Sequence, residues 1–179
     1  VITEAEIPDG FAVPFSFYDE FMRTNGLYDR VRSLLADDRF RSDPTVQDMK
    51  LAALRDTIEA SPMPGWMERA LATTKAAVHY TDFRFSPGDI IMTGRESAGV
   101  PDFSGAGLYD SFTQHPDEGP LTKCVKQVFA SVWNLRAYLE RDFYRIDHLS
   151  TAMGVLLIPA FENERANGVA VSADPVYDT

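Results

Sequence analysis

One glycine-rich segment combines the residue types that could hold a phosphate chain, FSGAGLYDSF at Phe103–Phe112. Gly105 and Gly107 have no Cβ, so the backbone there can approach a ligand closely or adopt a positive φ. Asp110 and Ser111 follow directly and add a carboxylate and a hydroxyl. Two interpretations follow. The segment is a tight connection in which Asp110 caps a local turn, or it is a loop opened for a ligand such as the phosphates of a nucleotide.

Other reactive side chains point to no further chemistry. The three histidines, His79, His115 and His148, are scattered without a second histidine or cysteine at metal-ligand spacing, so no zinc site is predicted. We expect His148 to cap or pack at a helix end. Cys124 lies on the apolar side of a predicted helix and is interpreted as a core residue. No Gly-x-Ser-x-Gly segment predicts a hydrolase nucleophile.

Composition limits the partners. The formal net charge is −10, from 17 Lys and Arg against 27 Asp and Glu, and such a surface repels nucleic acids. The net charge does not exclude nucleotide binding, because backbone N–H groups, an arginine and Mg²⁺ determine the electrostatic field at such a site. No apolar run approaches the roughly 20 residues that span a bilayer, and a single cysteine fits a reducing compartment. We therefore expect a cytoplasmic protein without nucleic-acid or membrane partners.

A short strand and several helices are predicted in the first half of the chain. Ser16, with Asp19 three residues later, predicts a helix start, and the helical pattern is interrupted near Asn25–Gly26. A second helix is predicted to begin at Asp43–Pro44, and a third covers residues 66–78. The apolar positions predicted to face the core from the second helix are Val46, Met49, Ala53 and Ile58.

The second half mixes strands and a helix. A buried strand is predicted at Ile90–Met92, then the glycine-rich loop, and then the longest helix, from about Pro116 to Tyr144. Two strands, Met153–Phe161 and Ala166–Ala173, form a predicted hairpin around the turn ENERAN. This order indicates an α/β (α+β) domain, with a mostly helical part at 1–85 and a loop, long helix and β-hairpin at 86–179. The two parts are expected to form one structural unit.

Three segments together resemble those of one known family. The opening, IPDGFAVPFSFYDEF, is similar to the Pro-x-Gly-Phe start of the nucleotide-binding domain of the pyruvate phosphate dikinase, phosphoenolpyruvate synthase and glucan water dikinase family. The glycine-rich loop of that family's domain resembles FSGAGLYDSF in this chain. The helix, strand and hairpin that follow in that family resemble VFASVWNLRAYLERDFYRIDH and MGVLLIPAFENERANGVAVSADP. The resemblance covers nearly the whole chain.

The resemblance implies an ATP-grasp-like domain that holds ATP and Mg²⁺ and phosphorylates a histidine on a separate, mobile domain. That phosphohistidine passes its phosphoryl group to pyruvate, glucan or another acceptor. Gly105 and Gly107 match the family's glycines over the phosphates, and Asp110 and Ser111 match the acid–hydroxyl pair after them. These residue types suit phosphoryl transfer, which depends on positioning and charge neutralisation.

The chain departs from the family before the loop. The family has Arg-Ser-Ser and then Glu-Asp-Leu-Pro, whereas this chain has MTGRESAGVPDFSG. Arg95 matches the phosphate-binding arginine if a short gap is placed before the loop. Without a gap, Met92 takes that place. In both alignments the acidic pair is lost, and Ile158 stands where many relatives have a glutamine beside the adenine.

Further family features are missing from the sequence. The lysine-bearing Leu-Gly-x-Lys segment and the phosphohistidine domain are not present. In the family, the metal-binding carboxylates usually follow the Asp-Pro that begins here at Asp174. Asp174 itself is the candidate metal ligand. We expect a fragment of a larger protein, or a short degenerate relative, that lacks complete catalytic machinery alone.

The leading prediction is the ATP-binding part of a dikinase-type phosphotransferase. Arg95, Gly105, Gly107, Asp110 and Ser111 are predicted to face the phosphates, ATP and Mg²⁺ are the implied ligands, and a phosphohistidine domain on the same or another chain is the implied partner. The alternative is a non-catalytic relative that acts as a ligand-sensing or protein-interaction module. An apolar face left by a missing part would favour a homodimer.

Overall fold

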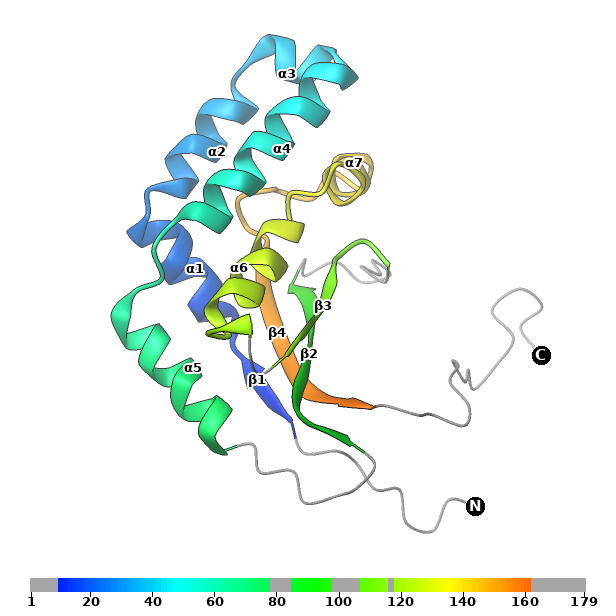
Figure 1. Cartoon of the computed structure of the whole chain (residues 1–179). Coiled ribbons are helices and arrows are strands. Elements are labelled where there is room, and N and C mark those ends of the chain that lie inside the picture. Colours follow the sequence, from blue (N-terminus) through cyan, green and yellow to red (C-terminus); the bar gives the residue numbers. More distant parts are fainter. Residues whose placement is uncertain (1–9, 78–84, 98–106, 116–117, 162–179) are drawn as a thin grey trace, which may run out of the picture.

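The computed structural model describes residues 10–77, 85–97, 107–115 and 118–161 (Figure 1). Helices dominate the first part of the chain, and strands and helices alternate afterwards. The elements in chain order are β1 (Phe11–Val13), α1 (Phe15–Thr24), α2 (Leu27–Leu35), α3 (Asp38–Ser42), α4 (Pro44–Ala60), α5 (Gly65–Ala77), β2 (Phe85–Ser97), β3 (Ser111–Gln114), α6 (Thr122–Ser131), α7 (Leu135–Phe143) and β4 (Ala152–Phe161).

The described strands form one antiparallel sheet in the order β1-β4-β2-β3. Strand β4 lies between β1 and β2, so the beginning and the later part of the chain are neighbours in the sheet (Figure 1). Ala12 lies opposite Leu156, and Thr93 on β2 lies opposite Ser111 on β3. Because β1 pairs with β4, residues before and after position 85 contribute to the same sheet.

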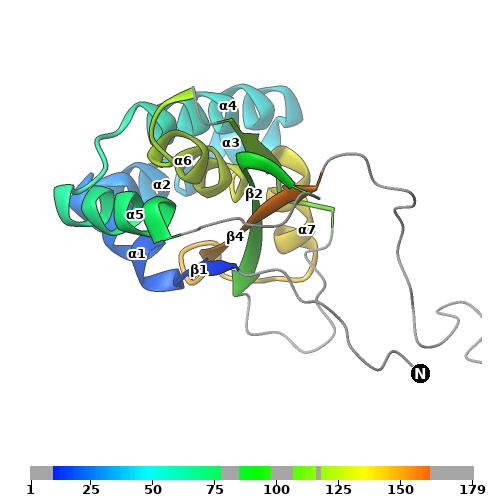
Figure 2. The same cartoon turned by 60° about the horizontal axis from the view of Figure 1, so that its bottom comes forward.

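The helices form the other layer. Helix α6 contacts β2, β3 and β4, α1 contacts β4, and α4 packs on α6 (Figures 1 and 2). One apolar cluster fills the space between these elements, and burial of such side chains is the main favourable contribution to folding. It includes Tyr18, Phe21, Leu51, Ile58, Val128, Phe129, Met153 and Val155.

The start of α1 differs from the prediction, and its end confirms it. The helix begins at Phe15, with Pro14 as the extended N-cap residue and no side-chain cap, so the predicted Ser16 cap is wrong. The backbone N–H of Phe17 already donates to the Pro14 carbonyl at 3.0 Å, which places Ser16 inside the first turn. The predicted interruption is confirmed by Gly26, whose φ of 62° is left-handed.

Helix α4 begins where the sequence predicts. The Asp43 carboxylate accepts hydrogen bonds from the backbone N–H groups of Thr45 and Val46 at 2.9 and 3.3 Å. Its buried face differs from the predicted one, because Met49 is 62% exposed. The buried residues recur at four- and three-residue steps on the side that meets α6, and they are Gln47, Leu51, Leu54 and Ile58.

The predicted single helix from Pro116 to Tyr144 is wrong. Two helices occupy this stretch, and they are separated at Val132–Asn134. Asn134 has an extended ψ of 139°, which turns the chain between α6 and α7. A single straight helix would place Leu139 on nearly the same face as Val125, but Leu139 is 45% exposed because the turn changes the direction of the second helix.

Strands β2 and β4 extend and confirm the predicted ones. Strand β2 has 13 residues, and the predicted Ile90–Met92 lies within it. Strand β4 matches the predicted Met153–Phe161, whereas the second strand of the hairpin, at 166–173, lies outside the described residues. In the part of the chain that the structure describes, no helix is both long enough and apolar enough to cross a bilayer. The division at residue 85 stays a prediction.

Candidate functional site

The described end of the glycine-rich loop leads into β3. Gly107 has a φ of 76°, and apart from its chain neighbours no described residue has an atom within 4 Å of the position a Cβ would take. The positive φ explains why glycine stands there, and the backbone is open on that side. Gly105 and Asp174, the other predicted glycine and the candidate metal ligand, lie outside the described residues.

The backbone of the candidate arginine lies at the same end of the sheet as this loop. Ser111 opens β3 and pairs with Thr93 on β2, and Arg95 lies two residues further along β2, opposite Gly154 on β4. Met92, the alternative at the arginine position, lies opposite Phe112. Because β2 and β3 are antiparallel neighbours, the end of β2 and the start of β3 meet where the loop leaves the sheet.

Asn134 connects this loop to the helices. Its side-chain Nδ2 donates to the Leu108 carbonyl at 3.4 Å and to Asp110 Oδ2 at 3.2 Å. Leu108 is 6% exposed, so its side chain is anchored in the protein as well. Asn134 was not among the site residues predicted from the sequence. The available signal was an asparagine inside a helical pattern, because this residue favours caps and turns over helix interiors.

Two arginines hold the corner between α6 and α7, which we define as Val132–Asn134. Arg141 Nη2 donates to the Val132 carbonyl at 2.6 Å, and Arg55 Nη1, from α4, donates to the Trp133 carbonyl at 2.9 Å. Carbonyls at the end of a helix have no partner within the helix, and a positive charge is favourable there. The two guanidinium groups therefore stabilise the turn that ends α6.

The side chains of this corner are buried together. Trp133 Nε1 donates to the Tyr18 hydroxyl at 3.1 Å, and the Arg141 guanidinium lies 5.5 Å from the centre of the Trp133 ring. Arg141 is completely buried, and its Nε donates to His148 Nδ1 at 3.3 Å. The His148 ring stacks on Tyr138 at 4.4 Å. The packing role predicted for His148 is confirmed, and Trp133 and Tyr138 are buried beside it.

His148 is held neutral in this environment. Burial and then the Arg141 charge lower the pKa of His148 to about 4, against the weaker raising effect of Asp142 and Asp147. A neutral ring can accept a hydrogen bond at Nδ1, as the contact with Arg141 requires. Cys124 is also buried, which raises the pKa of its thiol and confirms its predicted core role.

Two polar atoms of the segment Tyr109–Gln114 have no partner among the described residues. They are the Tyr109 hydroxyl and the Gln114 side-chain carbonyl oxygen, and both are buried. Tyr109 immediately precedes Asp110, and Gln114 ends β3. Most buried polar groups are hydrogen-bonded, so this segment retains hydrogen-bonding capacity. No group of three or more His, Cys, Asp or Glu that could hold a metal ion occurs among the described residues.

Comparison with known proteins identifies the family. The AMP/ATP-binding domain of pyruvate phosphate dikinase matches residues 2–178. Phosphoenolpyruvate synthase of Aeropyrum pernix is 24% identical over 170 residues, which cover 95% of this chain and 21% of that protein. The Escherichia coli phosphoenolpyruvate synthase is 27% identical over 170 residues, covering 94% and 21%. Rifampicin phosphotransferase of a Streptomyces species is 25% identical over 179 residues, covering 98% and 19%.

The chain belongs to the family of the pyruvate phosphate dikinase AMP/ATP-binding domain. The matches identify it as an AMP/ATP-binding domain of this family and do not favour the alternative of a non-catalytic module. The chain spans about a fifth of the length of these curated relatives. The predicted family is confirmed, and the mixed, helix-dominated α/β fold is consistent with nucleotide binding.

Proposed function

We propose that this domain holds ATP with Mg²⁺ in an ATP-grasp-like site and serves phosphoryl transfer to a histidine of a phosphohistidine domain, on the same or another chain, in the cytoplasm. The observation that carries the proposal is the family match along residues 2–178. Arg95 is assigned to charge neutralisation, Gly105 and Gly107 to close backbone approach, and Asp110 and Ser111 to hydrogen bonding or anchoring of the loop.

The geometry of the described residues supports this assignment. Ser111 and the backbone of Arg95 lie at one end of the β2–β3 pair, and the backbone of Gly107 is open on the side where a Cβ would stand. The unused hydrogen-bonding capacity of Tyr109 adjoins the same loop. Mg²⁺ usually binds one or two carboxylates together with substrate phosphates, and Asp174 is the proposed protein ligand.

Calorimetric titration of the chain with Mg-ATP, combined with thermal unfolding, tests the proposal. A ligand at 100-fold excess over its Kd adds about 2.7 kcal/mol of stability if it binds only the native state. Arg95→Ala should weaken binding at least about tenfold, because a charge-assisted contact to phosphate is lost. The matched control is Arg30→Ala, which removes the same charge from an exposed position on α2.

The two variants separate the possible failures. Wild-type chain that does not bind Mg-ATP contradicts the proposed function of this domain. If the wild type binds and Arg95→Ala binds as well as Arg30→Ala, the function stands and the assignment of Arg95 is wrong.

A further inference from the structure

Asn134 bridges two structural layers with one side-chain amide. The two acceptors on the loop, the Leu108 carbonyl and Asp110 Oδ2, are 26 and 24 residues away in sequence. They flank Tyr109 and lie directly after Gly107, whose left-handed backbone begins the described part of the loop. A single donor group therefore restrains both the backbone and the carboxylate of this segment.

The residue that carries this amide is itself firmly held. The carbonyls of the two preceding residues, Val132 and Trp133, accept hydrogen bonds from Arg141 and Arg55. The Trp133 side chain is 1% exposed and is bonded to Tyr18. Side chains that are locked by packing and by further hydrogen bonds hold functional groups within small tolerances. The corner thus presents the Asn134 amide from a rigid part of the molecule.

The order of this loop has a consequence for ligand affinity. A loop that is disordered before binding loses conformational entropy when the ligand arrives, and this cost weakens the affinity. A loop that is already fixed avoids that cost. Holding Leu108 and Asp110 in place before binding therefore strengthens the affinity for a ligand at any site that this loop forms.

We infer that Asn134 is a positioning residue that pre-orders the Gly107–Ser111 loop for the phosphates of the nucleotide. The inference rests on the proposed function, since it assigns the loop to the same site. Asn134 acts through Leu108 and Asp110.

The experiment measures two properties of Asn134→Ala and Asn134→Asp. The first is backbone amide hydrogen exchange at residues 107–111 without nucleotide, and the second is the Kd for Mg-ATP. We expect exchange at least about fivefold faster, because the loop opens more often, and Mg-ATP binding at least about tenfold weaker. Asn134→Asp should have the larger effect, because it places a second carboxylate against Asp110.

A matched control is available at another corner. Asn25 Nδ2 also donates to two carbonyls, those of Phe21 and Pro62, at 2.9 and 3.1 Å. Asn25→Ala should lower stability to a similar extent while leaving both the exchange at 107–111 and the Kd unchanged. Equal exchange at 107–111 in Asn134→Asp and Asn25→Ala would overturn the inference.

A charge swap gives a second, independent readout. Asp110→Asn combined with Asn134→Asp restores the amide–carboxylate pair with the partners exchanged but not the bond to the Leu108 carbonyl, so exchange at 107–111 should be slower than in Asn134→Asp alone. Exchange in the swapped protein as fast as in Asn134→Asp alone would also overturn the inference. A wild type that does not bind Mg-ATP would contradict the proposed function, and the exchange data would still decide whether Asn134 orders the loop.

Discussion

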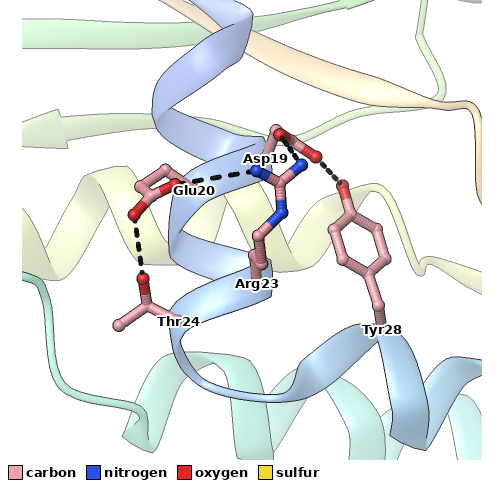
Figure 3. A network of polar contacts seen from close by, with 5 residues as sticks. All are labelled: Asp19, Glu20, Arg23, Thr24 and Tyr28. Atoms are coloured by element: carbon pink, nitrogen blue, oxygen red, sulfur yellow. Dashed lines mark hydrogen bonds and ion pairs between the residues drawn. The ribbon is translucent and has the colours of Figure 1, made fainter.

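Two corners between consecutive helices use polar side chains in opposite ways. At the α1–α2 corner, Asp19 accepts from Arg23 at 2.7 Å and from Tyr28 at 3.0 Å (Figure 3), and the Arg23 and Asp19 side chains are 67% and 41% exposed. At the α6–α7 corner, Trp133 and Arg141 are at most 1% exposed. The Asp19–Arg23 pair is exposed to water, whereas Trp133 and Arg141 lie in the core.

The partners also differ in their distance along the chain. Arg23 is four residues from Asp19 on the same helix, whereas Arg55 is 78 residues from Trp133. Exposed ion pairs between neighbouring helical residues contribute little, because water and salt screen them. Buried polar groups are costly when a partner is lost. We therefore expect substitutions at the α6–α7 corner to lower the free energy of unfolding strongly. Substitutions at the α1–α2 corner should change it little.

The largest effect is expected for Arg141→Met. The substitution leaves the buried Val132 carbonyl without its charged donor and removes the contact with Trp133, so the free energy of unfolding should fall by about 3 kcal/mol. Urea unfolding at pH 7 measures it. Arg136→Met, at an exposed position on the same helix, is the control and should change the value by less than about 0.5 kcal/mol. A loss of stability in Arg141→Met no larger than in the control would contradict the expectation that the α6–α7 corner controls stability.

The second effect is a pH dependence at His148. Its folded pKa of about 4 lies below the ordinary value of 6.5, so the unfolded chain binds a proton first as the pH falls. Stability from this group is present above pH 6.5 and is lost between 6.5 and 4. Between pH 7 and 5 the loss should be about 2 kcal/mol. His148→Phe should lack this part of the pH dependence in urea titrations. Identical slopes for both proteins would show that His148 is not held neutral.

A smaller effect is expected for Arg55→Ala. Its guanidinium donates to the Trp133 carbonyl from a partly buried position, and such a bond to a charged donor contributes about 1 to 2 kcal/mol. The loss should show as a lower urea midpoint with an unchanged m-value. A change below about 0.3 kcal/mol would mean that Arg141 alone holds the corner.

The smallest effect is expected at the exposed corner. Arg23→Ala removes the ion pair with Asp19, and the free energy of unfolding should change by less than about 0.5 kcal/mol. The difference from wild type should shrink further in 0.5 M NaCl, because the Debye length falls below about 10 Å. A loss above about 1 kcal/mol that persists in high salt would show that the exposed corner stabilises the protein as the buried corner does.

Much of the local structure was predictable because its causes are local. Asp43, followed by Pro44, starts α4 because its carboxylate accepts hydrogen bonds from the backbone N–H groups of Thr45 and Val46. Gly26 interrupts the helical pattern because its φ is left-handed. The family was predictable from three segments together: the opening, the glycine-rich loop and the stretch that begins at Val128. The buried face of α4 was not, because several apolar sets fit a helix and only the position of α6 selects one.

The sequence by itself determined the helix starts and breaks that glycine and capping residues enforce. It determined the family through the opening, the glycine-rich loop and the later segments together. Tertiary structure alone decided the break at Val132–Asn134, where no glycine or proline stands. The physical reason is that the donors that stabilise this turn, Arg55 and Arg141, become neighbours only when α4 and α7 pack around α6. The contact of Asn134 with Asp110 depends on the same packing.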